Sequence, residues 1–176
     1  MQRRAEALAA RWAGGGVHEV TGDFMNLALD IVGTSVFGVE HLAHDEALQR
    51  ATGTMQQYSG NTMVRSRLTA ISEDDIQAAI DTLDRLVQGV MAQPRRDGDL
   101  VGMMRAATDP VSGQGFSDRE VRDEALNILM AGHETTANAL AWACFLLSAH
   151  PAVQEAVREE LHSVVGERSV TADDLP

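Results

Sequence analysis

One long, nearly uninterrupted helical segment towards the C-terminus most constrains what this chain can fold into. Ser117 and Glu120 stand three residues apart, as a capping box requires, because each side chain can then accept the backbone N–H of the other residue. No proline follows until Pro151, which cannot continue a helix and can open the next one. The segment therefore predicts one helix over about 117–149, about 33 residues or roughly 50 Å long. Its apolar residues occupy every side between 125 and 147, which predicts that other helices enclose it.

The remainder of the chain shows the same helical periodicity. In residues 23–37, Phe24, Leu27, Ile31 and Val32 form the expected apolar face. In the helix that Ser72 caps and Pro94 stops, the expected buried stripe is Ile76, Ile80, Leu83, Leu86, Val87 and Val90. Further helices are expected over 1–12, 47–68, 100–107 and 152–165. Only residues 16–20 leave room for a strand, so the predicted fold class is all-α.

Composition and charge exclude several classes of protein. Acidic residues outnumber basic ones by 26 to 14, and a formal charge of −12 would repel nucleic acid. The single cysteine, Cys144, excludes a disulfide scaffold. The first twelve residues lack the pattern of a signal peptide, which predicts a cytoplasmic protein. Residues 125–149 are apolar enough to suggest a membrane span, but the polar groups near their middle favour a buried helix instead.

The long helix contains a group of residues that a purely structural helix would not need, Ala131-Gly132-His133-Glu134-Thr135-Thr136. A glycine in the middle of a helix costs about 1 kcal/mol relative to alanine. Thr135 lies four residues after Ala131, so its hydroxyl can hydrogen bond to that carbonyl. Together these residues predict a shallow notch with a hydroxyl on its rim and the Glu134 carboxylate beside it, where a small ligand could bind. The direction of His133, about 100° from that of Gly132, predicts that it packs or meets solvent instead.

Two other readings of these residues fail. A zinc peptidase of the His-Glu type needs a second histidine four residues after His133, and Ala137 stands there. The glycines at 113 and 115 lack the third glycine and the preceding strand of a dinucleotide-binding loop. No residue of the chain is therefore assigned as a metal ligand.

At this point the residues resemble a known family, the cytochromes P-450. The segments that carry the resemblance are Phe116-Ser117-Asp118, residues 131–136, His150-Pro151, Glu159-Glu160-Leu161 and residues 171–175. In their order they are similar to the distal oxygen-binding helix of that family and the helix after it. Residues 23–38 resemble an earlier core helix, and residues 40–72 match only weakly.

The resemblance implies a partial cytochrome P-450 fold, all-α, with one long central helix, in which residues 1–176 form an incomplete domain. It implies that Ala131, Gly132, Thr135 and Thr136 border a haem b cofactor. Thr135 and Glu134 would be catalytic, with Thr135 stabilising the oxygen intermediate on the iron and Glu134 relaying protons. The parent enzyme would be a haem-thiolate monooxygenase, which inserts one atom of dioxygen into a small organic substrate. Its electrons would come from a ferredoxin or a flavin reductase.

The family's axial cysteine ligand has no counterpart in this chain. Cys144 lies on the oxygen-side helix in a setting rich in Phe and Leu, where a small core hydrophobe is expected. Glu155 and Arg158 match a Glu-x-x-Arg pattern one helix too early, and predict a surface ion pair instead. The isolated fragment is therefore expected to be inactive. The alternative is a non-enzymatic all-α ligand-binding or interaction domain, whose apolar pocket would be lined by Met55, Met63, Met91, Met103 and Met104.

Overall fold

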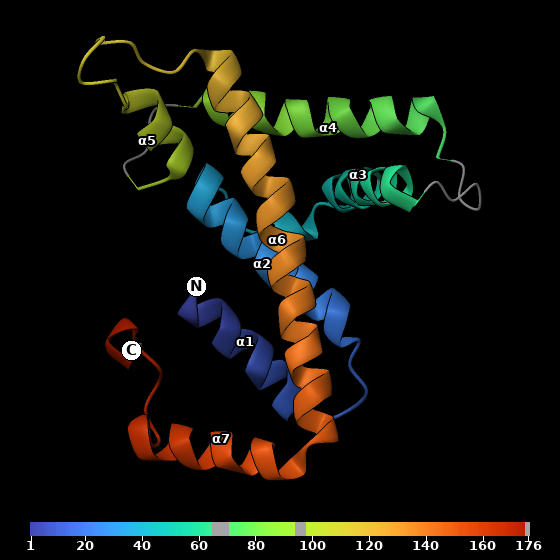
Figure 1. Ribbon diagram of the computed structural model, residues 1–176, viewed down its shortest axis with the longest axis vertical. Coiled ribbons are helices and arrows are strands. Elements are labelled where there is room, and N and C mark those ends of the chain that lie inside the picture. The colour runs from blue at the N-terminus through green and yellow to red at the C-terminus, as the bar shows by residue number, and fades with distance from the viewer. Residues whose placement is uncertain (65–70, 94–97, 175–176) are drawn as a thin grey trace. The chain divides into compact units, whose positions relative to one another are not determined.

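The chain folds into helices joined by short connections (Figure 1). The computed structural model describes residues 1–64, 71–93 and 98–174. Within these ranges there are seven α-helices, two short 3₁₀ turns and no β-strand, which confirms the all-α prediction. The elements are α1 (Gln2–Ala13), α2 (Val20–Phe37), η1 (Leu42–His44), α3 (Glu46–Val64), α4 (Glu73–Met91), α5 (Leu100–Ala106), α6 (Asp118–Ala149), α7 (Pro151–Val164) and η2 (Ala172–Asp174).

Most helix boundaries agree with the sequence prediction, and the differences are local. α2 begins three residues earlier than expected, at Val20, so residues 16–20 form no strand. The 3₁₀ turn η1 was not predicted, because three residues carry too little periodicity to reveal it. The expected end of α3 at Leu68 falls outside the described residues. Pro151 opens α7 at its first position, as expected of a residue that lacks an N–H.

Side-chain caps fix the starts of the two helices for which they were predicted. The Ser72 hydroxyl accepts the N–H of Asp75 at 3.1 Å, and the Asp75 carboxylate accepts the N–H of Ser72 at 3.3 Å. At α6, Glu120 accepts the N–H of Ser117 at 2.8 Å, and the Ser117 hydroxyl accepts the N–H of Glu120 at 3.3 Å. The hydrogen bonds from the hydroxyl and N–H of Ser117 lower the pKa of Glu120. The predicted cap at Ser72 and the predicted capping box at Ser117 are both confirmed, and Asp75 completes a capping box at Ser72 as well.

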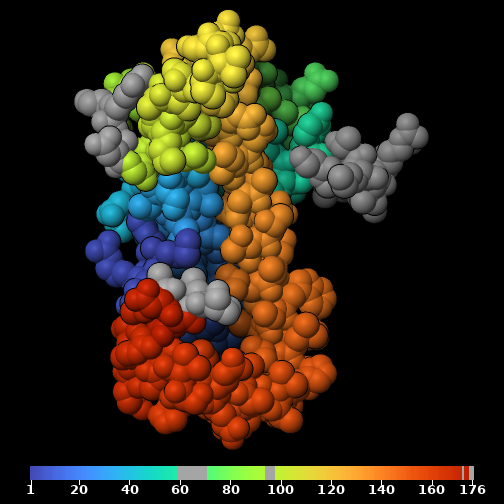
Figure 2. Space-filling model, turned by 60° about the vertical axis from the view of Figure 1, so that its left-hand side comes forward, coloured from blue at the N-terminus to red at the C-terminus, as the bar shows by residue number. Residues whose placement is uncertain are grey.

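The chain divides into two compact units, with the boundaries inside α2 and α6. The unit formed by residues 28–134 holds the main hydrophobic core. In it α3 packs against α4, while Val101 and Met104 of α5 join Val121 of α6 in the buried cluster. Figure 2 shows α5 in yellow-green beside the first turns of α6. The guanidinium of Arg122 also binds Asp84 of α4, with Nε 3.0 Å from the carboxylate, and this hydrogen bond raises the pKa of Arg122.

The buried faces of α2 and α4 differ from the prediction by part of a turn. On α2 Phe24 is buried as expected, but Leu27, Ile31 and Val32 are only half-buried. The fully packed positions are instead Ala28, Leu29, Val36 and Phe37. On α4 the buried residues are Ala79, Leu83 and Val87, with the other predicted apolar residues at the margin. The buried positions include the small residues Ala28 and Ala79, which a search for periodic large apolar residues does not reveal.

The other unit comprises residues 1–27 and 135–176. Its N-terminal part is held by the indole N–H of Trp12, which donates to Asp23 at 2.6 Å, and by the guanidinium of Arg11 on the same carboxylate. The Trp12 ring also meets Phe24 edge to face at a centroid distance of 5.3 Å. At the other end Arg168 pairs with Asp174, which lowers the pKa of that carboxyl well below its usual value. These contacts order both ends of the unit.

A close approach of backbone to side chain joins α2 and η1. A Cβ atom added at Gly33 would lie 2.6 Å from Cδ1 and 2.7 Å from Cγ of Leu42, a buried residue of η1. A side chain at position 33 would therefore push η1 away from α2.

We expect Gly33→Ala to be less stable than Gly89→Ala by about 1–3 kcal/mol in free energy of unfolding, the usual cost of overpacking. Gly89 is the matched control because it too lies in a helix, where an added Cβ would meet nothing within 4 Å. Both variants gain the same helix propensity, so their difference isolates the steric cost. Urea unfolding followed by circular dichroism measures it, and equal stabilities would contradict the close contact.

Candidate active site on helix α6

The predicted site residues lie on two different sides of α6. Ala131 and Thr135 are one turn apart on the same side, and both are exposed. Glu134 is half-buried at the edge of that side. Thr136 is also exposed, but it lies about 100° around the helix from Thr135. The arrangement therefore brings a methyl group, a hydroxyl and a carboxylate to one stretch of helix surface.

The expectation that α6 is enclosed on every side is wrong. Its buried residues follow one row at every fourth position, namely Val121, Ala125, Leu129, His133 and Ala137. The opposite side carries exposed residues over the same stretch, namely Asn127, Ala131, Thr135, Asn138 and Trp142. Among the described residues, one face of α6 is therefore buried, and of the predicted site residues Ala131 and Thr135 lie on the exposed face.

The glycine at position 132 is explained by packing within the unit of residues 28–134. A Cβ atom built on Gly132 would lie 3.3 Å from Cγ2 of Val32 on α2. The missing side chain thus allows α2 and α6 to approach each other. Val32 therefore occupies the space that the notch inferred from the sequence would leave beside Gly132, and a contact between Gly132 and a cofactor stays a prediction.

His133 packs inside the same unit, in agreement with the sequence prediction. Its side chain is 3% exposed, with Nδ1 2.7 Å from the carbonyl oxygen of Leu129 and Nε2 3.1 Å from the amide nitrogen of Gln56 on α3. Because a carbonyl oxygen can only accept, Nδ1 carries the proton and Nε2 accepts from the amide. The imidazole therefore connects α3 to α6 next to Glu134. Sequence reasoning did not find Gln56, since no local pattern pairs residues so far apart in the chain.

Replacing His133 by Phe, which keeps a ring of similar bulk, leaves the Gln56 amide without this acceptor. We expect it to lower the free energy of unfolding by about 1–3 kcal/mol, the usual cost of a buried polar group that loses its partner. The double variant His133→Phe/Gln56→Leu should lose less than the sum of the two single variants. The neighbouring Gln57 is exposed, so Gln57→Leu is the matched control and should change stability by less than about 0.5 kcal/mol. Strict additivity in urea unfolding would count against the bridge.

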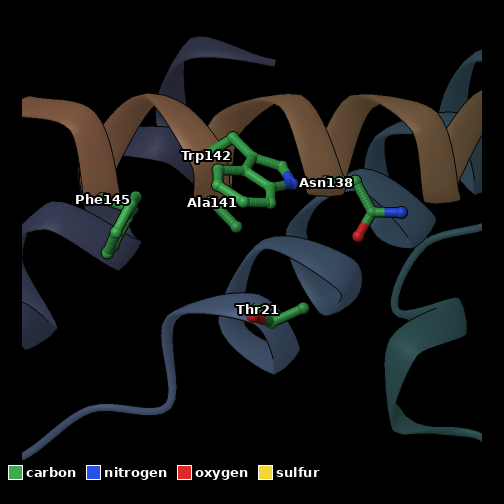
Figure 3. Close-up of a pocket in the computed structure, with 5 residues that line it drawn as sticks. All are labelled: Thr21, Asn138, Ala141, Trp142 and Phe145. Atoms are coloured by element: carbon green, nitrogen blue, oxygen red, sulfur yellow. The ribbon is translucent and has the colours of Figure 1, made fainter.

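A cavity of about 270 Å³ lies along α6 beyond Thr135, inside the unit that holds both ends of the chain. Figure 3 shows its lining residues: Asn138, Ala141, Trp142 and Phe145 of α6, and Thr21 of α2. Trp142 and Phe145 meet edge to face at a centroid distance of 5.6 Å. Small-molecule sites usually measure about 300–1,000 Å³, so this cavity is at their lower limit.

Cys144 also lies on the C-terminal half of α6, as a free thiol. It is half-buried, which corrects the expectation that it is a fully buried core residue. On α7, Arg158 pairs with Glu155 at 3.0 Å and both side chains are exposed, so the predicted surface ion pair is confirmed. Across the described part of the sequence, no helix combines the length and the hydropathy needed to cross a membrane.

Comparison with known proteins identifies the family. The family model described as Cytochrome P450 matches residues 5–176. Cyclooctatin synthase of Streptomyces melanosporofaciens is 29% identical over 187 residues, an alignment that covers all of this chain and 41% of that protein. A self-sufficient cytochrome P450 monooxygenase of Aspergillus niger is 26% identical over 187 residues, covering 97% of this chain and 18% of that protein.

Comparison with solved structures points to the same family. The crystal structure of the cytochrome P450DA heme domain superposes with a TM-score of 0.79 at 27% identity, covering 98% of this chain and 41% of that one. This chain therefore spans well under half the length of these relatives, and its helices form part of the cytochrome P450 fold. With a family match over nearly every residue and a solved relative of the same fold, the chain belongs to the cytochrome P450 family.

Proposed function

We propose that this chain supplies the oxygen-side helix of a haem-thiolate monooxygenase and belongs to one larger haem-binding domain. The observation that carries the proposal is the exposed Ala131–Thr135 side of α6, in a chain that belongs to the cytochrome P450 family. The resemblance assigns both Ala131 and Thr135 to the haem b site, together with Gly132 and Thr136.

The exposed side suits a flat, mostly apolar group. Ala131 contributes only a methyl group, and Thr135 one turn later contributes a methyl and a hydroxyl, so no bulky side chain stands on this stretch of surface. A haem bound there would supply the iron that activates dioxygen. Ala131 would contact the macrocycle, with Gly132 and Thr136 beside it.

Thr135 and Glu134 would handle protons. A hydroxyl both donates and accepts, so Thr135 would donate a hydrogen bond towards a ligand at this surface while it accepts another. Glu134 is the neighbouring ionisable group, and its half-buried position at the edge of the exposed side lets it exchange protons with solvent. The pair would therefore deliver protons to one point on the helix surface.

The proposed reaction inserts one oxygen atom of dioxygen into a small organic substrate and reduces the other to water, with two electrons from a ferredoxin or flavin partner. The substrate, the electron donor and a cytoplasmic location remain predictions. Turnover of the haem-loaded parent enzyme under ¹⁸O₂, followed by mass spectrometry, tests the proposal. One ¹⁸O atom per product molecule is expected, and product labelled only from water would overturn it.

The chain's own cysteine should not act as the haem ligand. Cys144 lies nine residues after Thr135 on the same helix, about 13 Å further along it, so it would not hold the haem together with the residues around Thr135. Mixing the purified 176-residue chain with haem, reducing it and adding carbon monoxide should therefore give no red-shifted band of thiolate-ligated haem. A band that appears, and is lost in Cys144→Ser, would contradict this prediction.

The alternative of an apolar pocket lined by methionines gains no support from the packing. Met55, Met91 and Met104 pack in or against the main hydrophobic core, and Met103 is exposed. The side chain of Met63 lies outside the described residues.

A further inference from the structure

Three metal-binding side chains meet where α2 passes η1. Asp30 comes from the middle of α2, His44 ends the 3₁₀ turn, and His41 caps the start of that turn. Each offers one ligand atom, and the three atoms all lie within 4.8 Å of one another. Residues at i and i+3 of a 3₁₀ turn lie one above the other, which explains why the two imidazoles face the same space.

The turn that carries the histidines is firmly attached to α2. Leu42 and Ala43, between the two histidines, are both buried, and Leu42 packs against Gly33. The N–H of His44 donates to the carbonyl of His41 at 3.1 Å and closes the turn. The amide of Gln49 also donates to the carbonyl of Ala43. The histidine backbones are therefore held in place without help from a ligand.

The Asp30 carboxylate is oriented by the same turn. Its Oδ1 accepts the N–H of Ala43 at 2.9 Å. A carboxylate has about four lone-pair positions, so accepting one backbone N–H is compatible with binding a metal ion. Such a backbone hydrogen bond is the kind of support that fixes metal ligands in protein sites.

We propose that Asp30, His41 and His44 bind a divalent transition-metal ion of the class that imidazole prefers, with Zn²⁺ as the representative. Two imidazoles and one carboxylate match the ligands of Zn²⁺, whereas Ca²⁺ and Mg²⁺ favour oxygen alone. Metal–ligand bonds of about 2.0–2.2 Å place ligand atoms about 3.4 Å apart, so the three atoms must close by about 1 Å. Rotation of the two exposed imidazoles suffices, and water completes the coordination.

The charges around the cluster favour a cation. Glu40 lies with its carboxylate 3.8 Å from Nε2 of His41, and the whole chain carries a net charge of −12. The other nearby carboxylate, Asp45, is already used, because it accepts the N–H groups of Ala47 and Leu48 at the start of α3. The bound ion would thus join α2 to the turn that leads into α3.

The test is a calorimetric titration of the metal-stripped chain with ZnCl₂, with Co²⁺ absorption as a second readout of coordination geometry. We expect one Zn²⁺ per chain. His44→Gln, His41→Asn and Asp30→Asn should each raise the Kd at least about tenfold, since loss of even a supporting partner of a metal ligand costs 10–100-fold. Asparagine at 41 tolerates the left-handed backbone there, at φ 65°, and asparagine at 30 keeps an acceptor for Ala43.

The control replaces two histidines outside the cluster, His150 and His162, by Gln, and should leave the Kd unchanged. Thermal unfolding with and without Zn²⁺ separates binding to the folded chain from binding to unfolded histidines, because only the former raises the Tm. No binding, a Kd unchanged in the three single variants, or a Tm that Zn²⁺ does not raise would each overturn the proposal.

Discussion

Thr135→Ala in the haem-loaded parent enzyme should divert electrons from product to hydrogen peroxide. If Thr135 directs protons as proposed, its loss would leave protons undirected, and dioxygen would be released with two electrons and two solvent protons as H₂O₂. Positioned proton donors contribute about 10²–10⁴-fold to rate, so a fall of about tenfold or more in product per electron pair is expected. The measurement compares consumption of the reduced electron donor with product and peroxide formed.

Two variants show whether the hydroxyl itself matters. Thr135→Ser keeps it and should restore most of the coupling. Thr82→Ala is the matched control, since Thr82 lies on α4 and donates its hydroxyl back to the carbonyl of Ala78 at 2.8 Å. Replacing threonine by alanine raises helix propensity at either position. A weakened helix therefore cannot explain a loss of coupling that occurs only in Thr135→Ala. Unchanged coupling in Thr135→Ala would refute the proposed role.

Leu129→Ala should cause one of the largest losses of stability available in this chain. Leu129 is 0% exposed and belongs to the main hydrophobic core, so truncation removes buried contacts and leaves a cavity. Comparable substitutions cost about 2–5 kcal/mol in free energy of unfolding. Urea unfolding followed by circular dichroism measures the loss.

Leu140 provides the matched control, because it lies on the same helix but is 38% exposed. Both substitutions change helix propensity equally. Leu140→Ala should therefore cost well under 1 kcal/mol if its exposed position behaves like other surface sites. Similar losses for the two leucines would mean that the burial pattern of α6 has been assigned incorrectly.

Local signals predicted the helices well. The capping boxes at Ser72 and Ser117 and the proline at 151 mark helix ends through hydrogen bonds and sterics that act within a few residues. The packed faces were harder to predict. On α2 the buried positions include Ala28 and Gly33, and the small size of Gly33 matters only because Leu42 of η1 packs against it.

For the candidate site, the sequence could predict only the residues that lie together on α6. The sequence placed Ala131, Glu134 and Thr135 on α6, and the helix geometry brings them to adjacent positions. It did not reveal that Gly132 faces Val32 or that Gln56 reaches His133. Those contacts depend on how α2 and α3 pack against α6, which no spacing along one helix encodes. The haem-binding role of these residues stays a prediction.

The contact between Gly33 and Leu42 limits the sizes of the residues that relatives of this chain can carry at these two positions. A relative with a larger residue at position 33 must carry a smaller one at 42, or else move η1 outward from α2. Outward movement would carry the histidines at 41 and 44 away from Asp30. We therefore expect positions 33 and 42 to covary, and the three ligand-type residues to occur together chiefly in sequences that keep the glycine.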